Sequence, residues 1–126
     1  MADELERISD YLIAVMKSDM KLRKSELSLP EPERSEIIEL HETLIGIIKR
    51  IVRYYSERKT DRDLVAEVHD QGKDITRKVK EIRNKFMQRM SDESFDPQVV
   101  LALNTQLNAY RQAKQHAQKI AKAIVG

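Results

Sequence analysis

The stretch DPQVVLALNTQLNAYRQAKQHAQKIAKAI, residues 96–124, carries the clearest helical pattern in the chain. Asp96 is a favourable N-cap, and Pro97 suits the first helical position. Phe95 and Val100 match the hydrophobic staple that often accompanies such a start. Apolar residues then recur at separations of three, four or seven: Val100, Leu103, Leu107, Tyr110, Ala117, Ala121 and Ile124. Sustained separation by seven is typical of helices that pack side by side at a shallow angle, so the stretch predicts one member of a bundle.

Two further helices are predicted in the first half of the chain. The first covers about residues 3–27, until Pro30 and Pro32 interrupt the pattern. Its apolar positions are Leu5, Ile8, Leu12, Val15, Met16 and Leu22. The second covers about residues 32–59, with Pro32 in its first turn. Its apolar positions are Ile37, Leu40, Leu44, Ile47, Ile48, Ile51, Tyr54 and Tyr55. We expect both apolar stripes to face a common core.

The remaining helix is predicted between the second helix and the stretch that begins at residue 96. Thr60 is expected to cap it, because its hydroxyl can accept a hydrogen bond from the amide of Asp63. The core positions are Leu64, Val68, Ile75, Val79, Ile82 and Phe86. Gly72 lies on the same face, where a neighbouring helix can approach closely. Short joints make successive helices antiparallel, so the sequence predicts an all-α antiparallel four-helix bundle, one domain over residues 1–126.

Composition narrows the classes of function. Lys and Arg number 23 against 21 Asp and Glu, so a formal charge of +2 gives no global attraction to nucleic acid, membranes or acidic substrates. The chain has no Cys, which excludes disulfides and a thiolate metal site. The longest apolar runs, such as residues 44–48, are too short to span a bilayer, and no signal peptide precedes them. We expect the chain as given to be soluble.

Catalytic motifs are missing from the sequence. A ferritin-like di-metal enzyme needs a Glu three residues before a core His. The residues three positions before His41, His69 and His116 are instead Ile38, Ala66 and Ala113. Nothing resembles a hydrolytic triad, a Gly-rich phosphate loop or a zinc motif. We therefore expect no enzyme, no catalytic residue, no cofactor and no small-molecule substrate. The basic positions of the last helix have no aromatic residues interleaved for base stacking, so we also expect no nucleic-acid partner.

Glu6 and Asp10 form the candidate metal site. The two acids are four residues apart and lie away from the apolar stripe of the first helix. Carboxylates one helical turn apart can bind a cation together if other ligands complete the shell. A solvated acidic face is the simpler interpretation, because acids at this spacing are common on exposed helices. Asp70 and Asp74 repeat the spacing on the third predicted helix.

The residues around Glu6 and Asp10 resemble a known signature. The stretch LERISDYL, residues 5–12, is similar to the signature of PhoU-type domains, Leu-Glu-Arg-Ile-Gly-Asp followed by His or Tyr, whose acid pair can hold metal. Ser9 replaces the usual Gly. Each repeat of that family has three long helices, and the signature lies on the third. The resemblance therefore implies that residues 3–27 are the last helix of one repeat, that a second three-helix repeat follows, and that the native chain begins further upstream.

The resemblance continues through SEIIELHETL, residues 35–44, and through residues 96–124. The last helix is similar to the form of this domain behind the membrane part of bacterial sodium/phosphate cotransporters. This implies a regulatory module in phosphate transport, on the cytoplasmic side of the inner membrane, with the membrane transporter domain as its partner in cis. We also expect a homo-oligomer, because missing helices would leave the surface around Tyr11 and Ile13 uncovered. The alternatives are a free-standing four-helix adaptor or signalling bundle, or a metal-binding protein.

The second copy of the signature departs from the family pattern. Arg111 and Gln115 stand where its two acids should be. A guanidinium and an amide cannot replace two carboxylates as cation ligands, so the second metal cluster is expected to be lost. At the first copy, Glu6 and Asp10 offer at most two side-chain ligands. We therefore expect no tightly bound iron or zinc.

Overall fold

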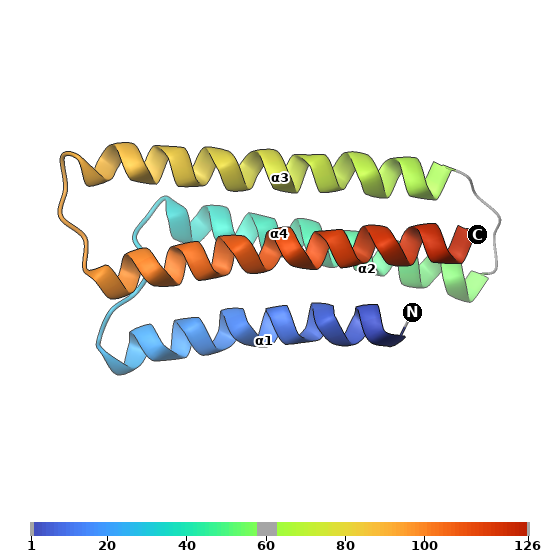
Figure 1. Ribbon diagram of the computed structural model, residues 1–126, viewed down its shortest axis with the longest axis horizontal. Coiled ribbons are helices and arrows are strands. Elements are labelled where there is room, and N and C mark those ends of the chain that lie inside the picture. The colour runs from blue at the N-terminus through green and yellow to red at the C-terminus, as the bar shows by residue number, and fades with distance from the viewer. Residues whose placement is uncertain (1, 58–62, 126) are drawn as a thin grey trace.

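Four helices make up most of the described chain, which comprises residues 2–57 and 63–125 of this computed structural model (Figure 1). They are α1 (Ala2–Lys24), α2 (Glu33–Glu57), α3 (Asp63–Met90) and α4 (Pro97–Val125). Each helix runs opposite to the one before it, and these residues contain no strand. The predicted all-α antiparallel four-helix bundle is confirmed. The predicted cap at Thr60 lies outside the described residues.

α4 is the helix that the other three share. Its backbone comes close to α1, α2 and α3, whereas α1 comes close to α4 alone among the described helices. Figure 1 shows α4 crossing the middle of the molecule, with α1 on one side of it and α3 on the other. α1 therefore has one close partner, and much of its surface stays in contact with solvent.

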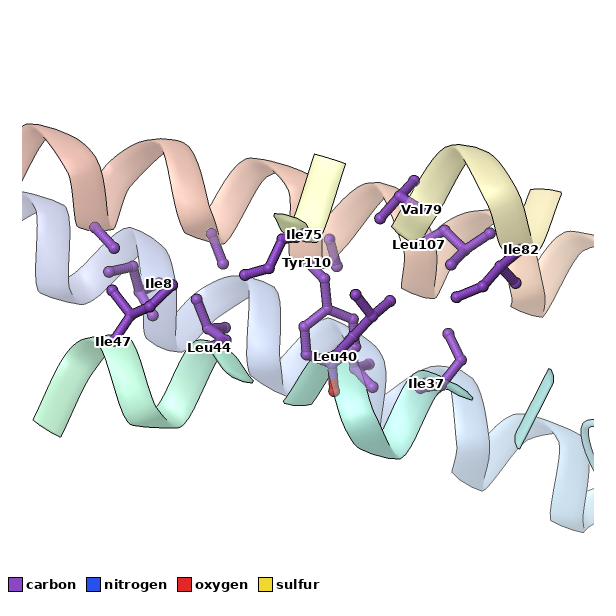
Figure 2. Packing of buried hydrophobic residues seen from close by; sticks show 14 of the residues in the cluster. Ile8, Ile37, Leu40, Leu44, Ile47, Ile75, Val79, Ile82, Leu107 and Tyr110 are labelled. Atoms are coloured by element: carbon purple, nitrogen blue, oxygen red, sulfur yellow. The ribbon is translucent and has the colours of Figure 1, made fainter. Parts of the chain in front are cut away.

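The predicted core is largely confirmed (Figure 2). All six apolar positions predicted for α3 are buried, and so is Gly72. Leu44 of α2 and Leu107 of α4 have no exposed surface. Burying a Leu or Ile side chain of this kind contributes about 1.5–3 kcal/mol each to folding, so this core is the main source of stability.

Three predicted core positions are wrong, and two of them are on α1. Leu5 is 39% exposed, Met16 is 63% exposed, and Tyr55 of α2 is 59% exposed. The buried residues of α1 are Ile8, Val15 and Leu22, which are seven residues apart. A helix with one close partner buries only a narrow seam of this spacing, whereas a helix surrounded by neighbours buries a wider stripe.

α1 ends at Lys24, three residues before the predicted end at residue 27. The Leu27 amide donates to the Leu22 carbonyl at 2.8 Å, and the Glu26 amide donates to the Arg23 carbonyl at 3.0 Å. This is the Schellman arrangement, and it requires Glu26 in the left-handed region at φ 58°. Glycine usually occupies that position, so a Glu there does not signal the end of the helix.

The predicted start of α4 is confirmed at atomic detail. An Asp96 Oδ1 oxygen accepts a hydrogen bond from the Gln98 amide at 2.8 Å, as an N-cap should. Next to it, the Phe95 ring packs on Phe86 of α3, with the ring centres 4.7 Å apart. The joint between α3 and α4 is thus fixed by both a polar cap and an aromatic contact.

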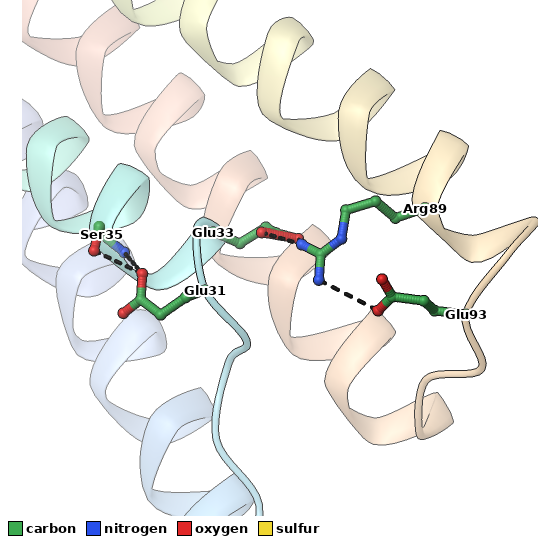
Figure 3. Close-up of polar contacts among 5 residues, drawn as sticks. All are labelled: Glu31, Glu33, Ser35, Arg89 and Glu93. Carbon is green, nitrogen blue, oxygen red and sulfur yellow. Dashed lines mark hydrogen bonds and ion pairs between the residues drawn. The ribbon is translucent and has the colours of Figure 1, made fainter.

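A buried ion pair joins the start of α2 to the end of α3 (Figure 3). Glu33 is 2% exposed, and both of its carboxylate oxygens accept from Arg89 Nη1, the longer contact measuring 2.6 Å. Arg89 Nη2 also reaches Glu93 at 3.5 Å. The burial of Glu33 was not predicted, because an acid in the first turn of a helix normally faces solvent.

Gly72 marks a close approach between α3 and α4. A Cβ atom at this position would clash with Gln118 Nε2 and would lie 3.4 Å from Lys114 Cδ. We predict that Gly72→Leu lowers the free energy of unfolding by about 1–3 kcal/mol, because the larger side chain overpacks the contact. Gly72→Ala is the matched control, and its effect should be smaller because the end of Gln118 can move aside. Urea denaturation measures both, and a stabilised Leu variant would contradict the prediction.

Candidate functional site

The candidate metal pair lies on the exposed surface of α1. Glu6 and Asp10 are both exposed, and Asp70 and Asp74 are exposed on α3. Asp74 accepts a hydrogen bond from Arg77 at 3.0 Å. Within residues 2–57 and 63–125, no group of three or more His, Asp or Glu residues is placed to hold a metal ion. Glu6 and Asp10 therefore offer two carboxylates without a third protein ligand.

The residues at the altered second signature are also exposed. Arg111 donates to the side chain of Asn108 at 2.9 Å, and Gln115 lies on the surface of α4. Neither residue is a cation ligand of the kind that the family signature would provide.

We predict that the double variant Glu6→Ala, Asp10→Ala has nearly the same melting temperature as the wild type, with or without added divalent metal. Two carboxylates on an exposed helix lack the ligand number that tight binding of Ca²⁺, Mg²⁺ or iron requires. Elemental analysis of the purified chain checks the same point. Finding a transition-metal ion in stoichiometric amount, and losing it in the double variant, would contradict the prediction.

A ladder of polar contacts that was not predicted joins α1 to α4. The α1 side contributes residues at intervals of seven, and their partners on α4 follow in reverse order. Glu4 contacts His116, Tyr11 contacts Gln112, Ser18 contacts Gln106, and Ser25 contacts Gln98. We call these eight residues the polar seam. The seven-residue spacing was visible in the sequence, but nothing there indicated which helix held the partners.

The polar seam runs alongside small side chains of α4. Ala102 and Ala109 are each 5% exposed, and Ala113 is fully buried. Small residues let two helix backbones come close together, which brings the short side chains of Ser18 and Ser25 within reach of α4. The Tyr11 hydroxyl donates to Gln112 at 3.2 Å, and the Ser25 hydroxyl donates to Gln98 at 2.9 Å. These contacts fix the position of α1 along α4.

His116 sits at the end of the polar seam nearest the N-terminus. Its side chain is largely buried, its Nδ1 atom contacts a Glu4 carboxylate oxygen, and its ring stacks on Tyr11 with the ring centres 5.7 Å apart. The hydrogen bond from His116 lowers the pKa of the Glu4 carboxyl below its usual value of 4.5. The first turn of α1 is therefore attached to α4 by a charge-assisted contact.

This contact makes part of the stability depend on pH. Because the pKa of Glu4 is lower in the folded chain, its stabilising effect is present above pH 4.5 and is lost as the pH falls through the folded-state pKa. We predict that Glu4→Gln is less stable than the wild type near neutral pH and that the difference shrinks in acid. Urea midpoints at neutral and acidic pH measure the difference. Glu6→Gln is the control, and an equal, pH-independent loss in both variants would contradict the prediction.

A second buried contact connects α4 to α2. Tyr110 is 2% exposed, and its hydroxyl lies 2.9 Å from His41 Nδ1. Burial raises the pKa of Tyr110 to about 12, and the nearby Asp19 carboxylate of α1 adds to the shift. Tyr110 thus stays neutral and can donate to His41.

α1 carries an exposed apolar flank, formed by Leu5, Ile13, Met16 and Met20. At 100° per residue these four side chains lie on one face of the helix, beside the buried seam. Ile13, Met16 and Met20 are 46%, 63% and 54% exposed. Exposed apolar side chains gathered on one helix face are a feature of interaction sites on soluble proteins. The α1 apolar flank is therefore the strongest candidate for an interaction surface.

Over the part of the chain that the structure describes, none of the helices is long and apolar enough to cross a membrane. Comparison with known proteins finds no matching family model, no matching curated protein and no matching solved structure.

Proposed function

We propose that this chain is a non-enzymatic interaction module that regulates phosphate transport. In this proposal it is the cytoplasmic C-terminal domain of a sodium/phosphate cotransporter, and its partner is the membrane domain of the same protein. The resemblance of LERISDYL to the PhoU signature supports the connection to phosphate. The single observation that carries the interaction role is the exposed α1 apolar flank, on the same helix as that signature.

The flank accounts for how such a module would act. Covering Ile13, Met16 and Met20 removes apolar surface from water, which contributes roughly 25 cal/mol for each Å² buried. A partner that offers a complementary surface in only one transport state gains this free energy in that state alone. Binding then shifts the transporter toward that state without any chemical step.

The same surface suits a second copy of the chain. When the partner domain is absent, the apolar flanks of two chains can cover each other through a two-fold contact. We therefore propose that the isolated chain self-associates through α1. Self-association and binding to the transporter would compete, because both use Ile13, Met16 and Met20.

Met16→Glu tests the proposal. We predict that it abolishes the effect of this domain on phosphate uptake and weakens self-association, because it places a charge in the centre of the flank. The melting temperature should change little, since Met16 is 63% exposed. Uptake of labelled phosphate by cells carrying the variant transporter measures the first effect, and light scattering of the isolated chain measures the second.

Met87→Glu is the matched control, because Met87 is 61% exposed on α3, away from the flank. It should leave both uptake and self-association unchanged. The transport role is contradicted if deleting the whole domain, with the membrane part still expressed, leaves phosphate uptake as it was. The role of the flank is contradicted if Met16→Glu and Met87→Glu behave alike.

A further inference from the structure

A cavity of about 290 Å³ lies where the end of α1 and the start of α2 meet α4. The apolar part of its lining comes from three segments: Leu22 on α1, Leu27 and Leu29 in the connection, and Ile37 and Ile38 on α2. Gln106 of α4 also lines it. Small-molecule sites in proteins combine apolar walls of this kind with a few convergent polar groups. The remaining lining residues provide those polar groups.

The lining of the cavity includes one buried acceptor without a donor, Gln106 Oε1, and the carboxylate of Asp19. Gln106 has no exposed surface, and its Nε2 atom donates to Asp19 Oδ1 at 2.8 Å. The Oε1 atom of Gln106 has no hydrogen-bond partner in the described chain. Asp19 is half-buried and forms no ion pair with any described residue. A buried acceptor without a donor is unfavourable, and a cationic N–H group would donate to Gln106 Oε1 and neutralise the charge of Asp19.

Two other lining residues carry the opposite charge. Arg23 and Arg34 both line it, and both are exposed. Neither guanidinium forms an ion pair within residues 2–57 and 63–125. Guanidinium groups bind carboxylates through paired N–H donors. Asp19 and Arg23 are one turn apart on the same face of α1, so groups for an ammonium and for a carboxylate lie close together.

We propose that this cavity binds a free α-amino acid with an apolar side chain. Its ammonium group donates to Asp19 and to Gln106 Oε1, its carboxylate is held by Arg23 and Arg34, and its side chain lies against the Leu and Ile walls. An inorganic anion alone fits less well, because it would bring negative charge toward Asp19 and leave the apolar walls unused. This inference does not depend on a role in phosphate transport.

Calorimetric titration of the full chain with L-leucine tests the proposal. We expect saturable binding, and we expect three related probes to bind at least about tenfold more weakly. Leucinamide lacks the carboxylate, 4-methylpentanoate lacks the ammonium group, and glycine lacks the apolar side chain. No heat with L-leucine up to about 10 mM would overturn the proposal. Equal binding of leucinamide or 4-methylpentanoate, or binding of inorganic phosphate in place of leucine, would overturn it as well.

Variants locate the site. Arg34→Gln should weaken leucine binding about tenfold, and Asp19→Asn should do the same if the variant folds. Arg7→Gln is the matched control, because Arg7 is exposed on α1 and does not line the cavity. Melting curves establish whether each variant is folded. If Asp19→Asn does not fold, Arg34→Gln alone decides the question. Leucine binding that is unchanged in Arg34→Gln would overturn this assignment of the site.

Discussion

The close packing of α4 against three neighbours is the constraint on which the rest of this bundle depends. A helix can be approached so closely from several sides only where side chains are small. Ala102, Ala109 and Ala113 meet this need toward α1, and Gly72 of α3 meets it on another side. Larger residues at these positions would push the helices apart and separate the short polar side chains that now meet. The small residues therefore determine both the packing and the hydrogen bonds.

The position of α1 follows from this constraint. Because α1 has one close partner, it buries only Ile8, Val15 and Leu22 and relies on the polar seam to fix its register on α4. Apolar contacts alone tolerate a shift of one helical repeat, whereas pairs such as Glu4 with His116 do not. The same geometry leaves the rest of the α1 surface without a helix packed on it. The apolar flank and the cavity beside Asp19 are thus two results of a helix attached along one seam.

Periodicity predicted the helices and most of the core, because the spacing of apolar residues reflects which face is buried. It failed at Leu5, Met16 and Tyr55, because an apolar residue does not reveal how many neighbours its helix will have. It also missed the end of α1, since Glu26 adopts a left-handed conformation that a glycine would have signalled. The burial of Glu33 and Gln106 was not predicted for a related reason. Polar residues are expected at the surface, and whether they are buried depends on partners far away in the sequence.

The cavity and the α1 apolar flank share one helix, and this links the two proposed binding events. Asp19 lines the cavity, whereas its neighbour Met20 belongs to the flank. A ligand that contacts Asp19, Arg34 and Gln106 at once holds the end of α1 against α2 and α4. A partner on the flank binds the same helix from outside. If both favour one position of α1, each raises the affinity of the other by the same factor, because coupling between two sites is reciprocal. The single seam that leaves α1 exposed is also what would let a small ligand influence a protein partner.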